Sequence, residues 1–494
     1  MRQLALLSVV EEDTLREEFS YEGVSPEAAR LALETRYGDL LEETLEFDRQ
    51  LVSFQANKTE TLHSWVKYRE GFSADLVESL LARFDIHPGD RILDPFAGSG
   101  TTLLVSQLLG IDAVGIDLLA HCHLAWEAKS QVFDYDLEEL RYIRQLVLKK
   151  APPATQEKFQ HLRITWSAFP EQTERDLMAY TRWFEKLNIS AQSKTLCKMI
   201  LTSNLEAISY TRKGGQYLRW DQRAQKIRDR NKKRRAQGKK PIRGMHKGPL
   251  PDVREAFLET LERIILDVQL LQKSPPPSST QQLIKGNALY ELPNMEGNQF
   301  DGVITSPPYA NRYDYTRTYA LEEAYLGIGE EIFKLRQRQL SCTVENRSKL
   351  DRLEEFYRSI GQYERYRHIL NTVHQNKALT EVNRALQIRE VRGEINNPSI
   401  LRMIEQYFTE LTFVFAELYR TCKHGAQIAF VNDNVRYAGE VIPVDLLSTN
   451  LAEQVGFTPV KVYVLTQRKG NSSQQMAKYG RVALRKSVII WQKE

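Results

Sequence analysis

Cysteine is scarce in this sequence, with only four in 494 residues. Cys122, Cys197, Cys342 and Cys422 lie far apart, and none belongs to a CxxC pair or to a His cluster at metal-ligand spacing. This distribution excludes a disulfide framework and argues against a structural zinc. We expect reduced, mostly buried thiols and no metal centre.

Long hydrophobic runs are also missing, since no stretch approaches the roughly 18 to 20 apolar residues of a membrane span. The N-terminal text "MRQLALLSVVEEDTLREE" has no small-residue cleavage site, which argues against a secretory signal. Hydrophobic residues make up 42% of the chain and charged residues 27%, as in soluble proteins with a sizeable core. We therefore expect a cytoplasmic protein of roughly two to four domains, with no membrane contact.

A large excess of one charge sign is absent overall, because the formal net charge is +4. The basic residues are nevertheless concentrated, since residues 212–247 contain fifteen Lys or Arg and two Asp. Such a run is often a solvated surface segment. It can also be an element that binds a polyanion by displacing counterions from phosphates. Other motifs of the sequence are needed to choose between these two interpretations.

The periodicity of apolar residues predicts one α/β domain that is interrupted by two largely helical insertions. Residues 61–130 read as helix, strand, Gly-rich turn, helix, strand and helix, which is the opening of a doubly wound parallel sheet. The expected parts are a helical N-terminal arm (1–60), three core segments (61–130, 281–310 and 401–494), a basic helical insertion (131–280) and a second helical insertion (311–400).

The segment "RILDPFAGSGTT" carries the strongest chemical signal. A short strand ends at Asp94, and a turn with Gly98 and Gly100 opens a helix at Thr101. Glycine lets the backbone approach a ligand closely, and a helix N-terminus offers free amide donors. The segment is not a phosphate loop of the GxxxxGK[ST] type, because no Lys follows the second glycine.

A second strand ends in "GIDLLA", where Asp117 follows the first turn by about 20 residues. At this spacing an acid can accept hydrogen bonds from a ribose diol, as in Rossmann-like nucleoside sites. Taken alone, Asp117 could equally be a helix N-cap. Together, the two strand ends predict a nucleoside-binding crevice.

A third signal lies in "FDGVITSPPY", where a buried strand runs into two prolines. Proline donates no backbone hydrogen bond and fixes its own φ, so Pro-Pro ends the ladder as a stiff, extended stub. A strand followed by a rigid loop is the simple interpretation. The alternative is that the two prolines fix the positions of nearby side chains and carbonyl groups at the edge of the sheet.

Together, "DPFAGSGTT" and "TSPPY" resemble the cofactor loop and catalytic motif of the DNA amino-methyltransferases, which transfer a methyl group from S-adenosylmethionine to an exocyclic base nitrogen. The resemblance covers roughly 61–130, 281–320 and 400–494 and implies a Rossmann-like methyltransferase sheet. "HSWVKYREGFS" and "LIKGNALYELP" look like further cofactor elements, although the family often has Asp where this chain has Asn287. The implied cofactor residues are Tyr68, Phe72, Asp94, Pro95, Phe96, Ala97, Gly98, Ser99, Gly100, Thr101, Asp117, Leu118, Asn287 and Ala288.

The resemblance gives the proline stub a chemical role. An exocyclic amine is a poor nucleophile because its lone pair is delocalised into the ring. The Ser306 side chain and the Pro307 carbonyl, held outward by Pro307 and Pro308, could grip the N–H groups and restore the lone pair. Tyr309 would stack on a base that has been flipped out of the helix.

The first residue of this stub bears on the substrate. In the resembled family, Asp at this position is typical of adenine-N6 enzymes and Ser of cytosine-N4 enzymes, so Ser306 favours cytosine N4. Adenine N6 stays open, as do an RNA base methyltransferase and a catalytically silent nucleic-acid-binding protein. No cysteine follows a proline in a turn after a strand, which argues against cytosine-C5 chemistry.

In a base-modifying enzyme, the basic run becomes a candidate DNA-binding element. The expected partners are double-stranded DNA and a cognate restriction endonuclease, although which insertion is the main recognition region stays open. Arg312, Tyr313 and Tyr315, directly after the stub, could border the flipped base or be structural. The candidate DNA-binding residues are Arg212, Lys213, Arg219, Lys232, Lys233, Arg234 and Arg235.

Overall fold

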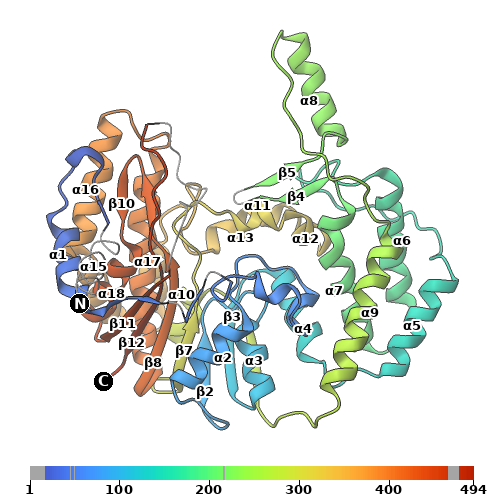
Figure 1. The fold of residues 1–494 in the computed structure, drawn as a ribbon, viewed down its shortest axis with the longest axis horizontal. Helices are drawn as coiled ribbons and strands as arrows, with labels where there is room; N and C mark the ends of the chain where they lie inside the picture. The colour runs from blue at the N-terminus through green and yellow to red at the C-terminus, as the bar shows by residue number, and fades with distance from the viewer. Residues whose placement is uncertain (1–16, 45, 49, 215–216, 466–477) are drawn as a thin grey trace, which may run out of the picture.

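The computed structural model describes residues 17–44, 46–48, 50–214, 217–465 and 478–494, and its centre is an eight-stranded sheet (Figure 1). β12 is antiparallel to both of its neighbours, and the other pairings in this sheet are parallel. In spatial order the strands are β6 (Gln281–Lys285), β3 (Asp112–Asp117), β2 (Arg91–Asp94), β7 (Phe300–Thr305), β8 (Cys422–Asp433), β12 (Lys486–Gln492), β11 (Thr458–Leu465) and β1 (Leu41–Thr44).

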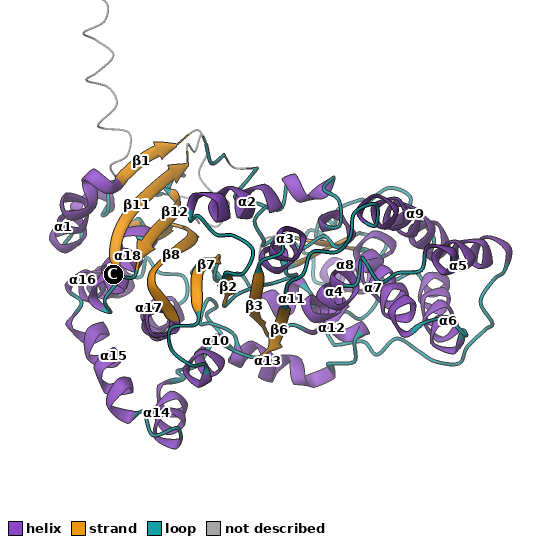
Figure 2. Cartoon of the chain, turned by 90° about the horizontal axis from the view of Figure 1, so that it is seen from below, coloured by secondary structure: helices purple, strands orange, loops and turns teal. Residues whose placement is uncertain are grey.

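Both faces of the sheet are covered by helices, which confirms the α/β doubly wound fold (Figure 2). Alternate residues of a strand point to opposite faces. Ile92 and Ile304 accordingly pack with α2 (Ala74–Arg83) on one face. Leu93 and Val303 pack with α17 (Ser399–Thr421) on the other. The central strands are therefore buried on both sides, as parallel strands usually are.

Two groups of helices lie at opposite ends of the sheet (Figures 1 and 2). The group beyond β6 contains α4 (Ala120–Ser130), α5 (Leu137–Lys149), α6 (Glu171–Lys186), α7 (Ala191–Ile208), α8 (Gln225–Ala236) and α9 (Val253–Leu271). The group beyond β8 contains α1 (Ala28–Tyr37), α14 (Leu350–Ser359), α15 (Tyr363–Gln375), α16 (Lys377–Val391) and α18 (Val444–Gln454). Short helices, α10 (Ala288–Glu291), α11 (Tyr315–Thr318), α12 (Ala320–Tyr325) and α13 (Ile332–Arg338), lie between them.

The N-terminal region differs from the expected helical arm. The described part of residues 1–60 contains one α-helix, α1, and it also supplies strand β1 to the main sheet. Leu41 of β1 is paired with Val462 of β11, so this strand forms the edge of the sheet. Charged side chains at Glu42 and Glu43 are typical of an exposed edge strand, which explains why the segment resembles a helix in sequence.

The two insertions are largely helical and pack on the body of the domain. Residues 131–280 contain a small antiparallel hairpin of β4 (Thr211–Lys213) and β5 (Leu218–Trp220) beside their helices. Buried residues of α14, α15 and α16 share one hydrophobic core with the central strands. Helices α5, α7 and α9 similarly share a core with α3 (Thr101–Leu109). Both insertions are therefore continuous with the body of the domain.

Candidate active site

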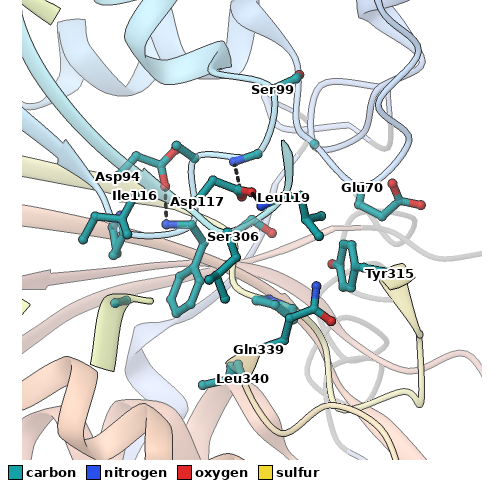
Figure 3. A pocket seen from close by; sticks show the side chains of 18 of the residues that line it. Glu70, Asp94, Ser99, Ile116, Asp117, Leu119, Ser306, Tyr315, Gln339 and Leu340 are labelled. Atoms are coloured by element: carbon teal, nitrogen blue, oxygen red, sulfur yellow. Dashed lines mark hydrogen bonds between the residues drawn. The ribbon is translucent and has the colours of Figure 1, made fainter. Parts of the chain in front are cut away.

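The candidate site lies where the order of the strands reverses, between β2 and β7. In open α/β sheets a crevice forms at this point, outside the carboxyl ends of the strands. The structure has a cavity there with an empty volume of about 750 Å³, which includes space open to solvent (Figure 3). Residues from the ends of β2 and β3, from the segments that follow β2 and β7, and from the segment 68–72 line it.

The loop after β2 has the backbone that its glycines predict. Gly98 and Gly100 have φ values of +53° and +84°, in the left-handed region. A Cβ atom on Gly98 would lie 2.6 Å from the Tyr68 ring, and one on Gly100 would lie 2.9 Å from the Trp126 ring. Helix α3 starts at Thr101 with no side-chain cap at Gly100, so its first amide groups are directed at the crevice region as donors.

Asp94 connects this loop to the end of β7, the strand that runs into the proline stub. Its carboxylate accepts hydrogen bonds from the Phe96 amide at 3.1 Å, the Thr102 hydroxyl at 2.7 Å and the Thr305 hydroxyl at 2.7 Å. Burial raises the pKa of Asp94 to about 6. Thr305 is the last residue of β7, directly before the stub. The two motifs are therefore joined by one buried carboxylate.

Asp117 shapes the same loop from the end of β3. Its carboxylate accepts from the Gly98 amide at 3.1 Å and from the Leu119 amide at 2.8 Å (Figure 3). Burial raises the pKa of Asp117 above its usual value. A carboxylate has about four acceptor positions, so both oxygens can still accept from a diol in the cavity.

Asn287 caps α10 at the opposite side of the cavity. Its Oδ1 accepts from the Leu289 amide at 3.0 Å, and its Nδ2 donates to the Arg338 carbonyl. The side chain is thereby fixed in one orientation, which an aspartate could not adopt with both partners because it has no donor. The departure from the family pattern at this position thus has a local structural role.

The predicted cofactor residues converge on this cavity, with one exception. Gly100 is absent from the lining and lies at the start of α3 against Trp126. The predicted residues that line the cavity are Tyr68, Phe72, Asp94, Pro95, Phe96, Ala97, Gly98, Ser99, Thr101, Asp117, Leu118, Asn287 and Ala288.

The proline stub begins at the same cavity. Ser306 and Pro308 line it, whereas Pro307 and Tyr309 are not among the lining residues. The Ser306 hydroxyl lies 3.1 Å from the Val431 carbonyl of β8 and 3.1 Å from the Tyr309 hydroxyl, with both as acceptors. Donation to either acceptor leaves the oxygen lone pairs of Ser306 free for another donor.

An ion pair between Lys486 and Asp433 lies close to the ring of Tyr309. Lys486 of β12 lies 3.2 Å from the carboxylate of Asp433, and its ammonium is 5.4 Å from the centre of the Tyr309 ring. Asp433 and Tyr309 raise the pKa of Lys486, although burial opposes this effect. The lysine is therefore cationic and fixes both the aspartate and the aromatic ring at the end of β8.

Several lining residues were not among the predicted cofactor residues. Glu70 lies in the quoted "HSWVKYREGFS" segment, and it accepts hydrogen bonds from the hydroxyls of Tyr313 and Tyr319. Tyr315, one of the residues proposed to border the base, does line the cavity. Gln339 and Leu340 come from the second insertion and carry no motif, so only the folded chain brings them here (Figure 3).

The candidate DNA-binding residues do not all lie at the surface. Lys213 is buried, with its ammonium 2.6 Å from Glu322 and 4.1 Å from the centre of the Tyr319 ring. It is thus an internal ion-pair partner, and its prediction as a DNA contact is corrected. Arg234 is partly used, because its Nε donates to the Lys240 carbonyl at 2.8 Å. The exposed candidates are Arg212, Arg219, Lys232, Lys233 and Arg235.

Comparison with known proteins identifies the family to which the chain belongs. A family model described as DNA methylase, of the N6/N4 methyltransferase class, matches residues 33–128. The Type II methyltransferase M.BsoBI of Geobacillus stearothermophilus is 55% identical over 478 residues, which cover 96% of this chain and 94% of that protein. The chain belongs to the S-adenosylmethionine-dependent DNA amino-methyltransferase family.

Other members support this assignment to the DNA amino-methyltransferases. The Type II methyltransferase M.AvaI of Nostoc sp. is 39% identical over 472 residues, which cover 94% of this chain and 92% of that protein. M.MjaII of Methanocaldococcus jannaschii is 38% identical over 117 residues, or 24% of this chain. No solved structure matches the chain.

The residues of this DNA amino-methyltransferase fit the family's cofactor. Gly98 and Gly100 leave space that a Cβ would fill, and Asp117 stands at the end of the second strand of the crevice. Within the described residues, no group of three His, Cys, Asp or Glu is arranged to hold a metal ion. No helix in this described part of the chain has the length and apolarity of a membrane span.

Proposed function

We propose that the protein is a site-specific DNA methyltransferase that modifies the exocyclic N4 of cytosine in a flipped-out base. It would be the modification enzyme of a restriction-modification system, with double-stranded DNA as substrate and a cognate restriction endonuclease as partner. Action on chromosomal DNA places it in the cytoplasm. The observation that carries this proposal is the placement of Ser306, whose neutral hydroxyl stands at the edge of the cofactor cavity.

S-adenosylmethionine supplies an electrophilic methyl group on a sulfonium. Tyr68, Phe72 and the loop from Asp94 to Thr101 would hold it, with Asp117 on the ribose and Leu118, Asn287 and Ala288 around the adenine. Ser306 donates to Val431 and so presents its lone pairs to the amine of the base. The Pro307 carbonyl is the second acceptor. The Ser306 hydroxyl is held by its hydrogen bond before the base enters, so this acceptor needs no reorganisation at the reaction.

Cytosine is favoured over adenine because the first position of the stub is a hydroxyl and not a carboxylate. The second reason is the ion pair between Lys486 and Asp433, in which the lysine neutralises the carboxylate at the end of β8. No uncompensated carboxylate therefore stands beside Ser306 from that side. Adenine N6 is the alternative, and it would use the same cavity and the same two acceptors.

The test is mass spectrometry of nucleosides from DNA that has been incubated with the purified protein and labelled S-adenosylmethionine. We expect N4-methylcytosine, reduced at least about 100-fold in Ser306→Ala, because oriented acceptors of this type contribute about 100- to 1000-fold. Tyr309→Ala should also lose activity while it retains cofactor binding. N6-methyladenine would overturn the cytosine assignment and leave the mechanism standing. Cofactor binding without a methylated base in DNA would favour an RNA substrate or a silent binding protein.

A further inference from the structure

Helix α8 projects from the body of the molecule, above the β4–β5 hairpin (Figure 1). Its sequence, QKIRDRNKKRRA, has one apolar residue that is buried, Ile227. A helix that is polar on nearly all sides gains little from packing on its own protein. Contacts with another molecule or with the chain segment beside it therefore have to stabilise this helix.

Helix α8 and the segment that follows it, residues 237–247, form an arm that projects from the molecule. This arm has a defined conformation despite its exposure. Asn231 donates to the Ile242 carbonyl at 3.1 Å and accepts from the Ile242 amide at 2.7 Å. Arg234 donates to the Lys240 carbonyl at 2.8 Å. These bonds join one side of α8 to the chain segment that returns to the body, so that side is the inner face of the helix.

The base of the arm is anchored on both chain segments. Arg223 binds the buried carboxylate of Asp221 with two hydrogen bonds of 2.9 Å. On the returning segment, the Lys247 ammonium donates to carbonyls near the end of α7, at 2.8 Å to Ser209 and 2.9 Å to Thr211. The arm is therefore held in a fixed direction, which reduces the entropy lost when a partner binds.

The outer face of α8 has a particular order of side chains. An α-helix turns about 100° per residue, so Gln225 and Asp229 lie opposite the inner residues Ile227 and Asn231. The Gln225 amide donates to Asp229 at 2.8 Å, which confirms that these two lie side by side. Basic residues flank this pair on both sides, with Arg230 and Lys233 on one flank and Arg228, Lys232 and Arg235 on the other.

This order matches the major groove of DNA. The groove is about 12 Å wide and admits one α-helix, with phosphates along both walls and base edges at its floor. We infer that α8 enters the major groove, with its two basic flanks on the phosphates of the two strands and with Gln225 and Asp229 toward the bases. Glutamine suits adenine and aspartate suits the cytosine amine, so this pair would help to read the target sequence.

The inference rests on the proposed function for its substrate, and binding and methylation are measured separately for that reason. The binding experiment follows the affinity of the full chain for a labelled duplex of mixed sequence as the salt concentration changes. The variant Arg228→Gln, Lys232→Gln, Arg235→Gln removes one flank. The slope of log affinity against log salt concentration is negative, and each lost phosphate contact makes it shallower by about 1. We therefore expect the slope of this variant to be shallower than that of the wild type by about 3.

The matched control removes three exposed basic residues from the opposite end of the molecule, in Arg367→Gln, Lys377→Gln, Arg384→Gln. It changes the net charge equally and should leave the salt slope unaltered. All six positions are in exposed parts of helices, so thermal melting should show both variants folded. An equal slope for the flank variant and the wild type would overturn the inference.

The reading role is tested by mapping the methylated positions that Gln225→Ala and Asp229→Asn produce on plasmid DNA. We expect the preference for one base pair of the target to decrease about tenfold, with the salt slope unchanged. An unchanged target with a decreased slope in the flank variant would overturn the base-reading role and leave α8 as a phosphate clamp. If the wild type methylates no DNA, the proposed function fails, and the salt dependence still decides whether α8 binds a duplex.

Discussion

The proposed cofactor loop, Asp94 to Thr101, and the proposed DNA-binding arm, made of α8 and residues 237–247, are two different kinds of surface. In the loop, polar atoms pair with one another before any ligand arrives, as in the three hydrogen bonds of Asp94. In the arm, the charges of Arg228, Lys232 and Arg235 are exposed to water. The loop therefore depends on close fit, whereas the arm depends on the number of its charges.

This difference has an energetic consequence. Buried polar groups lose about 1–3 kcal/mol when a partner is removed, and closely packed rings resist an added atom. Exposed charges contribute gradually and are screened by salt. Single substitutions should consequently abolish binding at the loop, while the arm should lose affinity in steps.

The largest expected effect comes from Gly98→Ala. The new Cβ would lie 2.6 Å from Cε1 of Tyr68, at a backbone φ of +53°. Left-handed strain and displacement of the Tyr68 ring together cost about 2–5 kcal/mol. Titration calorimetry with S-adenosylmethionine should show affinity weakened at least about 30-fold.

Gly238→Ala in the arm is the matched control. Gly238 has a φ of +67°, but nothing lies within 4 Å of its Cβ position. The substitution adds backbone strain of about 1–2 kcal/mol without a steric contact, and cofactor affinity should not change. Equal losses of affinity in the two variants would contradict the role assigned to Tyr68.

A smaller effect on cofactor affinity is expected where β4 meets the wall of the cavity. Lys213 pairs with Glu322 and covers Tyr319, whose ring stacks on Tyr68 at 5.4 Å between centres. Lys213→Met leaves Glu322 buried without its cation, which costs about 3–5 kcal/mol. Urea unfolding should show this loss, and calorimetry should show cofactor affinity weakened several-fold as Tyr68 loses support.

The control for Lys213→Met is a second buried pair of the same type. Lys349 lies 2.8 Å from Glu410 in the group of helices at the opposite end of the sheet. Lys349→Met should be destabilising to a similar degree, because it also leaves a carboxylate buried. Cofactor affinity should stay at the wild-type value, and a matching decrease would show that general instability, not the cavity wall, is being measured.

Short motifs predicted the loop well because the signal is local. The strand end at Asp94, the two glycines and the helix start at Thr101 are adjacent in sequence, and backbone rules act on neighbours. The contact between Thr305 and Asp94 spans 211 residues, and no local pattern indicates it. It depends on β2 and β7 lying side by side in the sheet.

The arm shows the opposite limit of sequence reasoning. A run of basic residues predicts a charged surface but not which lysine is turned inward. Lys213 is buried because β4 brings it against Glu322 of α12 and against Tyr319, which precedes that helix. Similarly, the Glu-rich text around β1 looks helical, and only its pairing with β11 makes it a strand. In both cases tertiary contacts override a local preference.

The last expected effect is a pH dependence of stability, and it concerns Lys129, whose ammonium contacts the loop that follows β2. It is 1% exposed and donates to the Ser99 carbonyl at 2.7 Å. Burial lowers its pKa from 10.5 to about 7, so between these values the unfolded chain binds a proton that the folded chain does not. The free energy of unfolding should therefore rise with pH across this window, and the full cost of the buried charge applies below it. Urea unfolding at both ends of the window should show a smaller rise in Lys129→Met and an unchanged rise in Lys198→Met, an exposed lysine on α7. Parallel pH profiles for Lys129→Met and the wild type would mean that this lysine does not titrate in the folded loop.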